Sequence, residues 1–138
     1  RCLEIKLIMS DNKKKQITNT LLNYFNLEEI LDQNLITVSP GNFLRINYFF
    51  VEKKIDIEGD PISNLSKILS LYKKEKDIFY RDLLLFFADY YLIINKFGKN
   101  SNKKKFIENR SFVVKNINDF FLYNLSQNTL LNSLEDSF

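Results

Sequence analysis

Apolar and polar residues alternate at the start of the chain. In the stretch LEIKL, the apolar Leu3, Ile5 and Leu7 fall on one side, and the charged Glu4 and Lys6 fall on the other. A period of two is typical of a half-buried β-strand. We therefore predict a first strand here, and we expect no signal or transit peptide within these residues.

The spacing becomes helical in the next segment. Ile17, Leu21 and Phe25 recur at intervals of four, and the polar residues 10–12 offer an N-cap just before them. This combination predicts an amphipathic helix that ends near Phe25.

Two further strands are predicted after this helix. The β-prone LITV at 35–38 runs into Pro40 and Gly41, a pair that is typical of a turn. The run at 43–57 is rich in β-branched and aromatic residues and is interpreted as one long strand. It stops at 59–61, because Pro61 cannot donate a hydrogen bond to a sheet.

The rest of the chain has helical patterns. A helix is predicted over 62–72, with Pro61 in its first turn and Asp60 as its cap. Residues 78–97 are apolar nearly all round and predict a second helix. The last 33 or so residues, estimated from the pattern, fit a helix or a short strand and helix over 106–125, followed by a short helix.

The apolar segment at 78–97 approaches the length of a membrane span. Arg81, Asp82 and Asp89 interrupt it. A charge that faces lipid costs roughly 2.5 to 3.5 kcal/mol. We therefore expect this helix to be buried in protein and not in a bilayer.

Together these elements predict an α+β fold. Residues 1–72 have the order β-α-β-β-α of a two-layer, ferredoxin-like domain. Residues 73–138 form a helical extension that packs on this domain or on neighbouring molecules. The basic stretch at 99–105 is interpreted as a linker within that extension.

Composition excludes several kinds of chemistry. The 138 residues contain no histidine and a single cysteine, Cys2, which rules out histidine-dependent nucleophiles and His- or Cys-rich zinc sites. Three glycines are too few for a phosphate-binding glycine loop. We expect no catalytic residue, no metal and no cofactor.

The acidic stretch around residue 58 is a candidate for a metal cluster. Asp56, Glu58 and Asp60 occur at alternate positions. In a strand they share a face but spread over roughly 13 Å, which is too far for a single ion. We therefore interpret them as a strand edge and a helix cap.

The basic residues are the candidates for binding. The formal net charge is only +3, but lysines occur in runs. Three of them open the first predicted helix, where the helix dipole disfavours a cation by a few tenths to about 1 kcal/mol. An anionic partner would explain this placement, and simple tolerance of solvated lysines is the alternative. With aromatic residues nearby to stack on bases, the candidate RNA-binding residues are Lys13, Lys14, Lys15, Arg45, Lys53, Lys54, Lys103, Lys104 and Lys105.

Three short motifs resemble the small-subunit ribosomal protein ten family, whose bacterial member is NusE. LEIKL at 3–7 is similar to the family's first strand, TVSP at 37–40 to its T-V-x-x-S-P-H motif, and KKIDI at 53–57 to a strand that ends before the proline of its second helix. The resemblance covers residues 1–72. The large-subunit protein twenty-three family has a similar strand and helix order.

The resemblance implies a structural, non-catalytic constituent of the small ribosomal subunit, bound to ribosomal RNA and to neighbouring ribosomal proteins. The segment after residue 72 has no counterpart in the family and would be an extension of the kind that divergent mitochondrial ribosomes carry, so the implied location is the mitochondrion. An accessory subunit of an organellar membrane (respiratory) complex is the alternative, and a free-standing helical interaction protein is a third possibility.

Overall fold

The computed structural model describes residues 9–35, 37–98 and 103–138, and it is helical. Six α-helices and a short 3-10 helix make up the regular structure of these residues, and none of them forms a strand. The chain divides into two compact units, Arg1–Ile55 and Asp56–Phe138, called unit 1 and unit 2 below. The predicted α+β fold, with a β-α-β-β-α domain over 1–72, is therefore wrong. The predicted boundary after residue 72 falls inside a helix.

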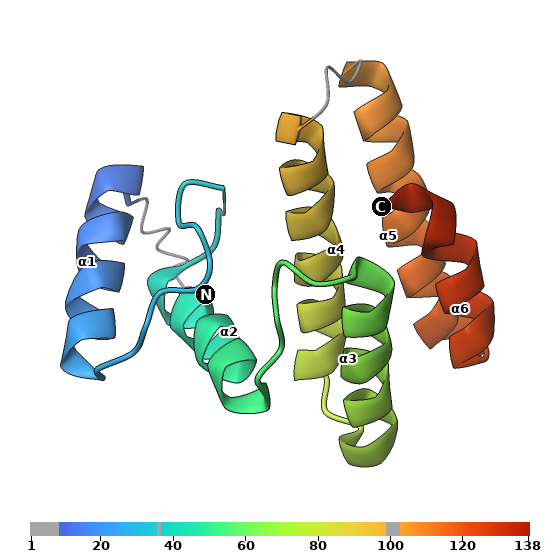
Figure 1. Cartoon of the computed structure of the whole chain (residues 1–138), viewed down its shortest axis with the longest axis horizontal. Helices are drawn as coiled ribbons and strands as arrows, with labels where there is room; N and C mark the ends of the chain where they lie inside the picture. Colours follow the sequence, from blue (N-terminus) through green and yellow to red (C-terminus); the bar gives the residue numbers. More distant parts are fainter. Residues whose placement is uncertain (1–8, 36, 99–102) are drawn as a thin grey trace, which may run out of the picture. The chain divides into compact units, whose positions relative to one another are not determined.

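Unit 1 contains two helices that contact each other, α1 (Asp11–Tyr24) and α2 (Pro40–Lys53) (Figure 1). The predicted strand at 35–38 lies in the irregular connection between them, as far as that connection is described. The predicted strand at 3–7 lies outside the described residues. The predicted helix near Ile17 is confirmed as α1, although Phe25 at its end is exposed.

Helix α2 replaces most of the long strand predicted over 43–57. Phe43, Ile46, Asn47 and Phe50 are all buried, and their spacing of three, four and seven residues is that of one helix face. Pro40 occupies the first turn, where its missing N–H is no loss. Aromatic and β-branched residues thus pack here on a helix, since tertiary burial outweighs a weak local preference for strand.

The irregular connection of unit 1 is held by one buried amide. The side chain of Asn47 is completely buried, and its Oδ1 accepts hydrogen bonds from the backbone N–H of Ile30 at 3.0 Å and Leu31 at 3.3 Å. Its Nδ2 donates to the carbonyl oxygen of Glu28 at 2.6 Å. One side chain from α2 therefore satisfies three backbone groups of a segment that has no regular structure of its own.

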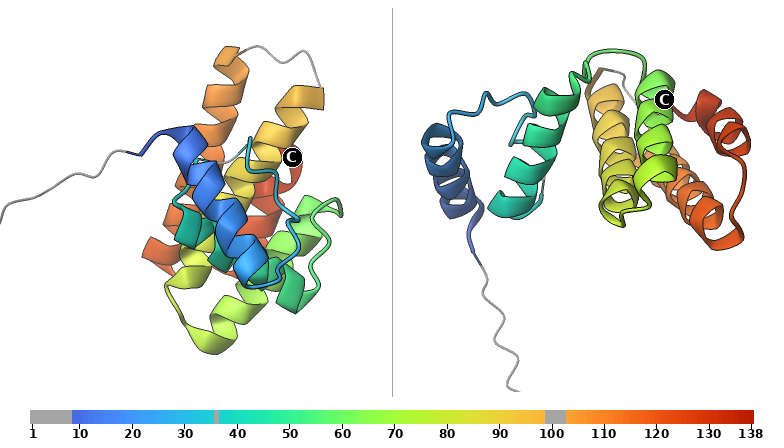
Figure 2. Two further views of the ribbon diagram at one scale, coloured as in Figure 1. Left: turned by 90° about the vertical axis from the view of Figure 1, so that its left-hand side faces the viewer. Right: turned by 90° about the horizontal axis from the view of Figure 1, so that it is seen from below.

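Unit 2 is a ring of four helices: α3 (Pro61–Glu75), α4 (Phe79–Gly98), α5 (Lys103–Tyr123) and α6 (Gln127–Leu134), followed by the 3-10 helix η1 (Glu135–Ser137). Each of the four packs on the next, and α6 closes the ring against α3 (Figure 2). The predicted helices over 62–72 and 78–97 are confirmed as α3 and α4. The segment at 106–125 is helical as far as Tyr123, and its helix starts within the predicted linker.

The core of unit 2 is built from side chains of all four helices. Its members are exposed by 2% or less: Leu65, Ile68, Leu69, Leu83, Leu84, Phe87, Ala88, Val113, Ile117, Leu130 and Leu134. The charge of Asp89 is neutralised by Arg110 of α5, which donates two hydrogen bonds of 2.7 Å to the Asp89 carboxylate.

Within the described ranges, no helix combines the length and the apolar character needed to cross a membrane.

The acidic stretch before α3 is a turn that caps a helix, and not a strand edge. Asp60 accepts a hydrogen bond from the N–H of Ser63 at 2.7 Å, as predicted for the cap of this helix, and Asp56 accepts one from the N–H of Glu58 at 3.0 Å. Gly59 leaves little room for a side chain in this turn, because a Cβ there would lie 3.1 Å from the carbonyl oxygen of Asp56.

A buried tyrosine fastens the same turn to α4. The hydroxyl of Tyr91 donates to the carbonyl oxygen of Ile57 and lies 3.0 Å from that of Gly59. The side-chain amide of Asn64 donates to this hydroxyl at 3.2 Å and to the carbonyl oxygen of Asp56 at 2.7 Å. Burial of the phenol raises the pKa of Tyr91 above 10.0, and the nearby charges of Asp56 and Asp60 raise it further.

This pKa shift predicts a loss of stability in alkali. In the unfolded chain Tyr91 ionises near its ordinary pKa of 10.0, whereas in the fold it holds its proton to higher pH. The unfolded state therefore loses the proton first, and the free energy of unfolding falls as pH rises above about 10. Thermal melts from neutral to alkaline pH should show a steeper decline for the wild type than for Tyr91→Phe. Equal declines in the two proteins would contradict this assignment.

Candidate functional site

The nine predicted RNA-binding residues do not form one surface. Lys13, Lys14 and Lys15 lie in the first turns of α1, and Lys53 and Lys54 lie at the C-terminal end of α2. Phe43, near the start of α2, lines a pocket together with Lys14 and Lys15. Because a helix rises 1.5 Å per residue, the end of α2 is about 15 Å farther along. Unit 1 therefore presents two separate basic positions.

The remaining predicted residues add further positions. Arg45 is exposed in the middle of α2. Lys103, Lys104 and Lys105 are exposed in the first turn of α5, in unit 2, where Lys104 lies 3.8 Å from Glu108. The sequence pattern identified exposed basic residues, but the fold distributes them over several places.

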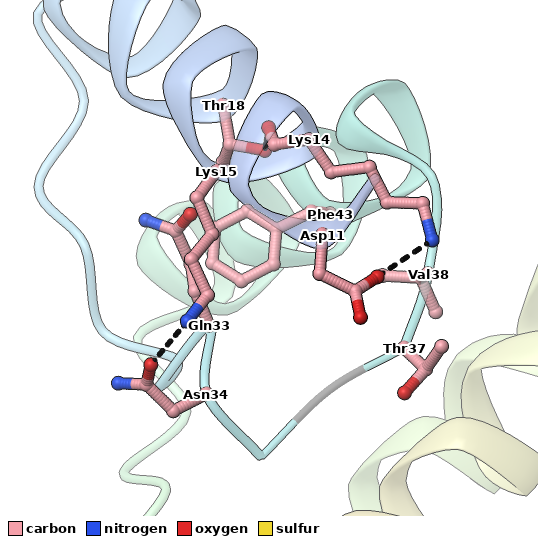
Figure 3. A pocket seen from close by; sticks show the side chains of 9 residues that line it. All are labelled: Asp11, Lys14, Lys15, Thr18, Gln33, Asn34, Thr37, Val38 and Phe43. Atoms are coloured by element: carbon pink, nitrogen blue, oxygen red, sulfur yellow. Dashed lines mark hydrogen bonds and ion pairs between the residues drawn. The ribbon is translucent and has the colours of Figure 1, made fainter. Parts of the chain in front are cut away.

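A small polar pocket lies at the start of α1 (Figure 3). It has a volume of about 130 Å³ and is walled by the first two turns of α1, by residues 33–34 and 37–38 of the connection, and by Phe43. Lys14 Nζ lies 3.0 Å from the Asp11 carboxylate, and Lys15 Nζ donates to Asn34 Oδ1 at 2.6 Å. Two of the three lysines that open the helix are thus directed along the pocket wall, and Lys13 is exposed.

A second candidate site lies where α3 ends, α4 begins and α5 ends. Two half-buried aromatic rings meet there, Tyr72 and Phe121, with centroids 4.9 Å apart and nearly perpendicular planes. A cation lies over the face of each ring. Lys76 Nζ is 5.2 Å from the centroid of the Tyr72 ring, and Arg81 Cζ is 5.7 Å from the centroid of the Phe121 ring. Arg81 also donates to Asn118 Oδ1 at 3.1 Å, which fixes its position over the ring.

Two exposed aliphatic side chains lie close to these residues along the sequence. Ile78 in the turn before α4 is 70% exposed, and Leu122, next to Phe121, is 72% exposed. We call this surface the Tyr72 patch; it consists of Tyr72, Lys76, Ile78, Arg81, Phe121 and Leu122. Lys76 ends α3 in the left-handed conformation, with φ at 56°. That conformation costs a lysine about 1 kcal/mol or more.

The Tyr72 patch was not predicted from the sequence. One local signal was available: Tyr72 and Lys76 are four residues apart, the spacing that places neighbours on one helix face. Leu122 could also have been noticed, because it lies opposite the buried stripe of Val113, Ile117 and Phe120 on α5. The gathering of three helix ends is a property of the fold and cannot be read from any one segment.

No group of three His, Cys, Asp or Glu side chains could hold a metal ion in the part of the chain that the structure describes. The comparisons with known proteins add no identity. No family model matches the sequence, and neither a curated protein nor a solved structure matches the chain at a significant level. The function is therefore inferred from the surfaces described above.

Proposed function

We propose that the protein is a structural subunit of a larger assembly and that it binds a partner protein through the Tyr72 patch. The observation that carries this proposal is the exposure of Ile78 and Leu122, which are close in sequence to a pair of contacting aromatic rings. Apolar side chains in water gain free energy when a partner covers them. Tyrosine and arginine are also the residues that most often dominate the energy of protein interfaces.

The charges around the patch indicate the chemistry of the partner. Lys76 and Arg81 lie over the rings, and Lys73 and Lys74 are exposed on the last turn of α3. Two acidic side chains beside the patch in sequence have local roles, whereas Asp82, next to Arg81, is exposed. Glu75 accepts a hydrogen bond from Tyr80 at 2.6 Å, and Asp77 accepts one from the N–H of Phe79 at 2.8 Å. The patch therefore suits a partner face that combines apolar and acidic side chains.

Site-specific crosslinking tests this proposal in cells of the source. A photoreactive benzophenone residue in place of Leu122 should give one recurrent crosslinked protein, and adding Ile78→Asp should abolish the product. Glu108 is also exposed on α5 and provides the matched control position. In a native extract, Leu122→Asp should shift the chain from a large particle to fractions near its own mass of 16.4 kDa.

Two results would contradict the proposal. One is the same set of crosslinked products from positions 108 and 122. The other is a wild-type chain that sediments alone in the native extract. The melting temperature of Leu122→Asp serves as the folding control, and it should hardly change because this side chain is mostly in water.

RNA binding within a ribosome is a second candidate. The exposure of Lys103, Lys104 and Lys105 favours it, since ammonium groups at a surface can neutralise phosphates. The motifs TVSP and KKIDI, which carried the resemblance to ribosomal protein ten, lie in helical or irregular structure. This candidate, a constituent of the mitochondrial small subunit bound to ribosomal RNA, therefore rests on the lysines.

Ribonuclease treatment separates the candidates. A ribosomal constituent should leave its particle when RNA is digested or when magnesium is removed. A subunit that is held through the Tyr72 patch alone should stay bound under both treatments. Comigration with a detergent-solubilised membrane complex would instead favour the accessory-subunit alternative.

A further inference from the structure

The pocket at the start of α1 carries an excess of positive charge. Lys14 is neutralised by Asp11 at 3.0 Å, but the Lys15 ammonium donates to Asn34, which is a neutral amide. Among the residues that the structure describes, no other charged side chain lines this cavity, although the Asp32 carboxylate accepts a hydrogen bond from Asn34 Nδ2 at 2.8 Å. A net charge of about +1 therefore faces a space of about 130 Å³ that is partly shielded from water.

The chain places these cations where a helix disfavours them. The N-terminal end of a helix has a partial positive charge, and its first N–H groups have no partner within the helix. The side chain of Ser10, the N-cap of α1, accepts no hydrogen bond from them. Lysines at this end raise the local potential further, and an anion in the cavity would relieve it.

We propose that this pocket binds a phosphate group. The volume fits an ion of this size, and the wall offers the ammonium groups of Lys14 and Lys15 and the hydroxyl of Thr37. Gln33 Nε2 already donates one hydrogen to Asn19 Oδ1 at 2.8 Å and has a second to give, whereas the Thr18 hydroxyl already donates to the Lys14 carbonyl at 2.9 Å. Asp11 competes with the ligand for Lys14. The bound phosphate replaces Asp11 as the partner of the Lys14 ammonium group, and the Asp11 carboxylate turns away from the phosphate.

Titration with inorganic phosphate tests this site in the full-length chain. Amide chemical shifts are followed by NMR while chloride keeps the ionic strength constant. Saturable shifts are expected for the residues that line the pocket. Lys15→Gln should weaken binding roughly tenfold, because one charge-assisted hydrogen bond is lost. Asp11→Asn should strengthen binding, because it removes the competing carboxylate. Lys53→Gln, at the other end of α2, should leave the affinity unchanged.

The direction of the Asp11→Asn effect keeps the test decisive even if Lys15→Gln perturbs folding. Absence of a saturable response to phosphate, or equal affinities in wild type, Lys15→Gln and Asp11→Asn, would overturn the proposal. A short oligoribonucleotide that competes with phosphate would assign the group to an RNA chain. Phosphate binding without such competition would assign it to a free ion or a small phosphate ester.

This site is independent of the Tyr72 patch, because the two lie in different compact units. Leu122→Asp should not alter phosphate binding, and Asp11→Asn should not alter crosslinking at position 122. A failure of one proposal therefore leaves the other standing.

Discussion

Replacement of Asn47 by alanine is expected to lower the free energy of unfolding by about 2 to 4 kcal/mol, since each buried backbone group left without a partner costs roughly 1 to 3 kcal/mol. The carbonyl of Glu28 and the N–H groups of Ile30 and Leu31 all lose their bond to this side chain. Leu31 is almost fully buried, so water cannot readily replace the lost acceptor at its N–H.

Chemical denaturation measures this loss, and hydrogen exchange localises it. The amides of Ile30 and Leu31 should exchange much faster in Asn47→Ala. Asn42→Ala is the matched control on the same helix. The side chain of Asn42 is exposed, and the hydrogen bond to Ser39 comes from the backbone N–H of Asn42, which the substitution leaves in place. Similar destabilisation by both substitutions would contradict the assigned role of Asn47.

Replacement of Phe87 by alanine is the second large expected effect, with a loss of about 3 to 5 kcal/mol. The ring is completely buried in unit 2, and its centroid lies 4.5 Å from that of Tyr91 in a nearly perpendicular arrangement. The substitution removes apolar burial, leaves a cavity and releases the ring that carries the hydroxyl bonded to the turn before α3. Loss of one side chain thus weakens both the packing and the polar anchor.

Two comparisons check this prediction by denaturant unfolding. Phe112→Ala on α5 is the control, and it should cost far less because Phe112 is about half exposed. The losses of Phe87→Ala and Tyr91→Phe should not add in the double variant, because the two rings are in contact. Simple additivity would show that the packing of Phe87 does not position the Tyr91 hydroxyl.

Helices α3 and α4 of unit 2 could be predicted because local signals there agree with the fold. Asp60 and Pro61 give an N-cap and a first turn, and the apolar spacing of α3 and α4 leads to a buried face. Helix α2 was mistaken for a strand because its aromatic and β-branched residues favour strand locally and because Pro40-Gly41 resembles a turn. The correct signal was the spacing of Phe43, Ile46, Asn47 and Phe50, which outweighs composition.

The candidate sites were predictable only in part. Sequence identified Lys14 and Lys15 as basic residues at an unfavourable helix position, and the structure places both on a pocket wall. The sequence could not show that Lys15 would donate a hydrogen bond to Asn34, which lies nineteen residues further along the chain. The Tyr72 patch was missed because its rings come from α3 and α5, which are far apart in the chain.

The ring of helices in unit 2 also brings its two ends together. Tyr91 bonds Ile57 near the start of the unit, and its ring centroid lies 6.3 Å from that of Phe138 at the end. A unit with adjacent ends tolerates circular permutation and can be spliced as a whole into a surface loop of another protein. Joining residue 138 to residue 56 through a short linker and opening the chain between α4 and α5 should therefore preserve the same four-helix core.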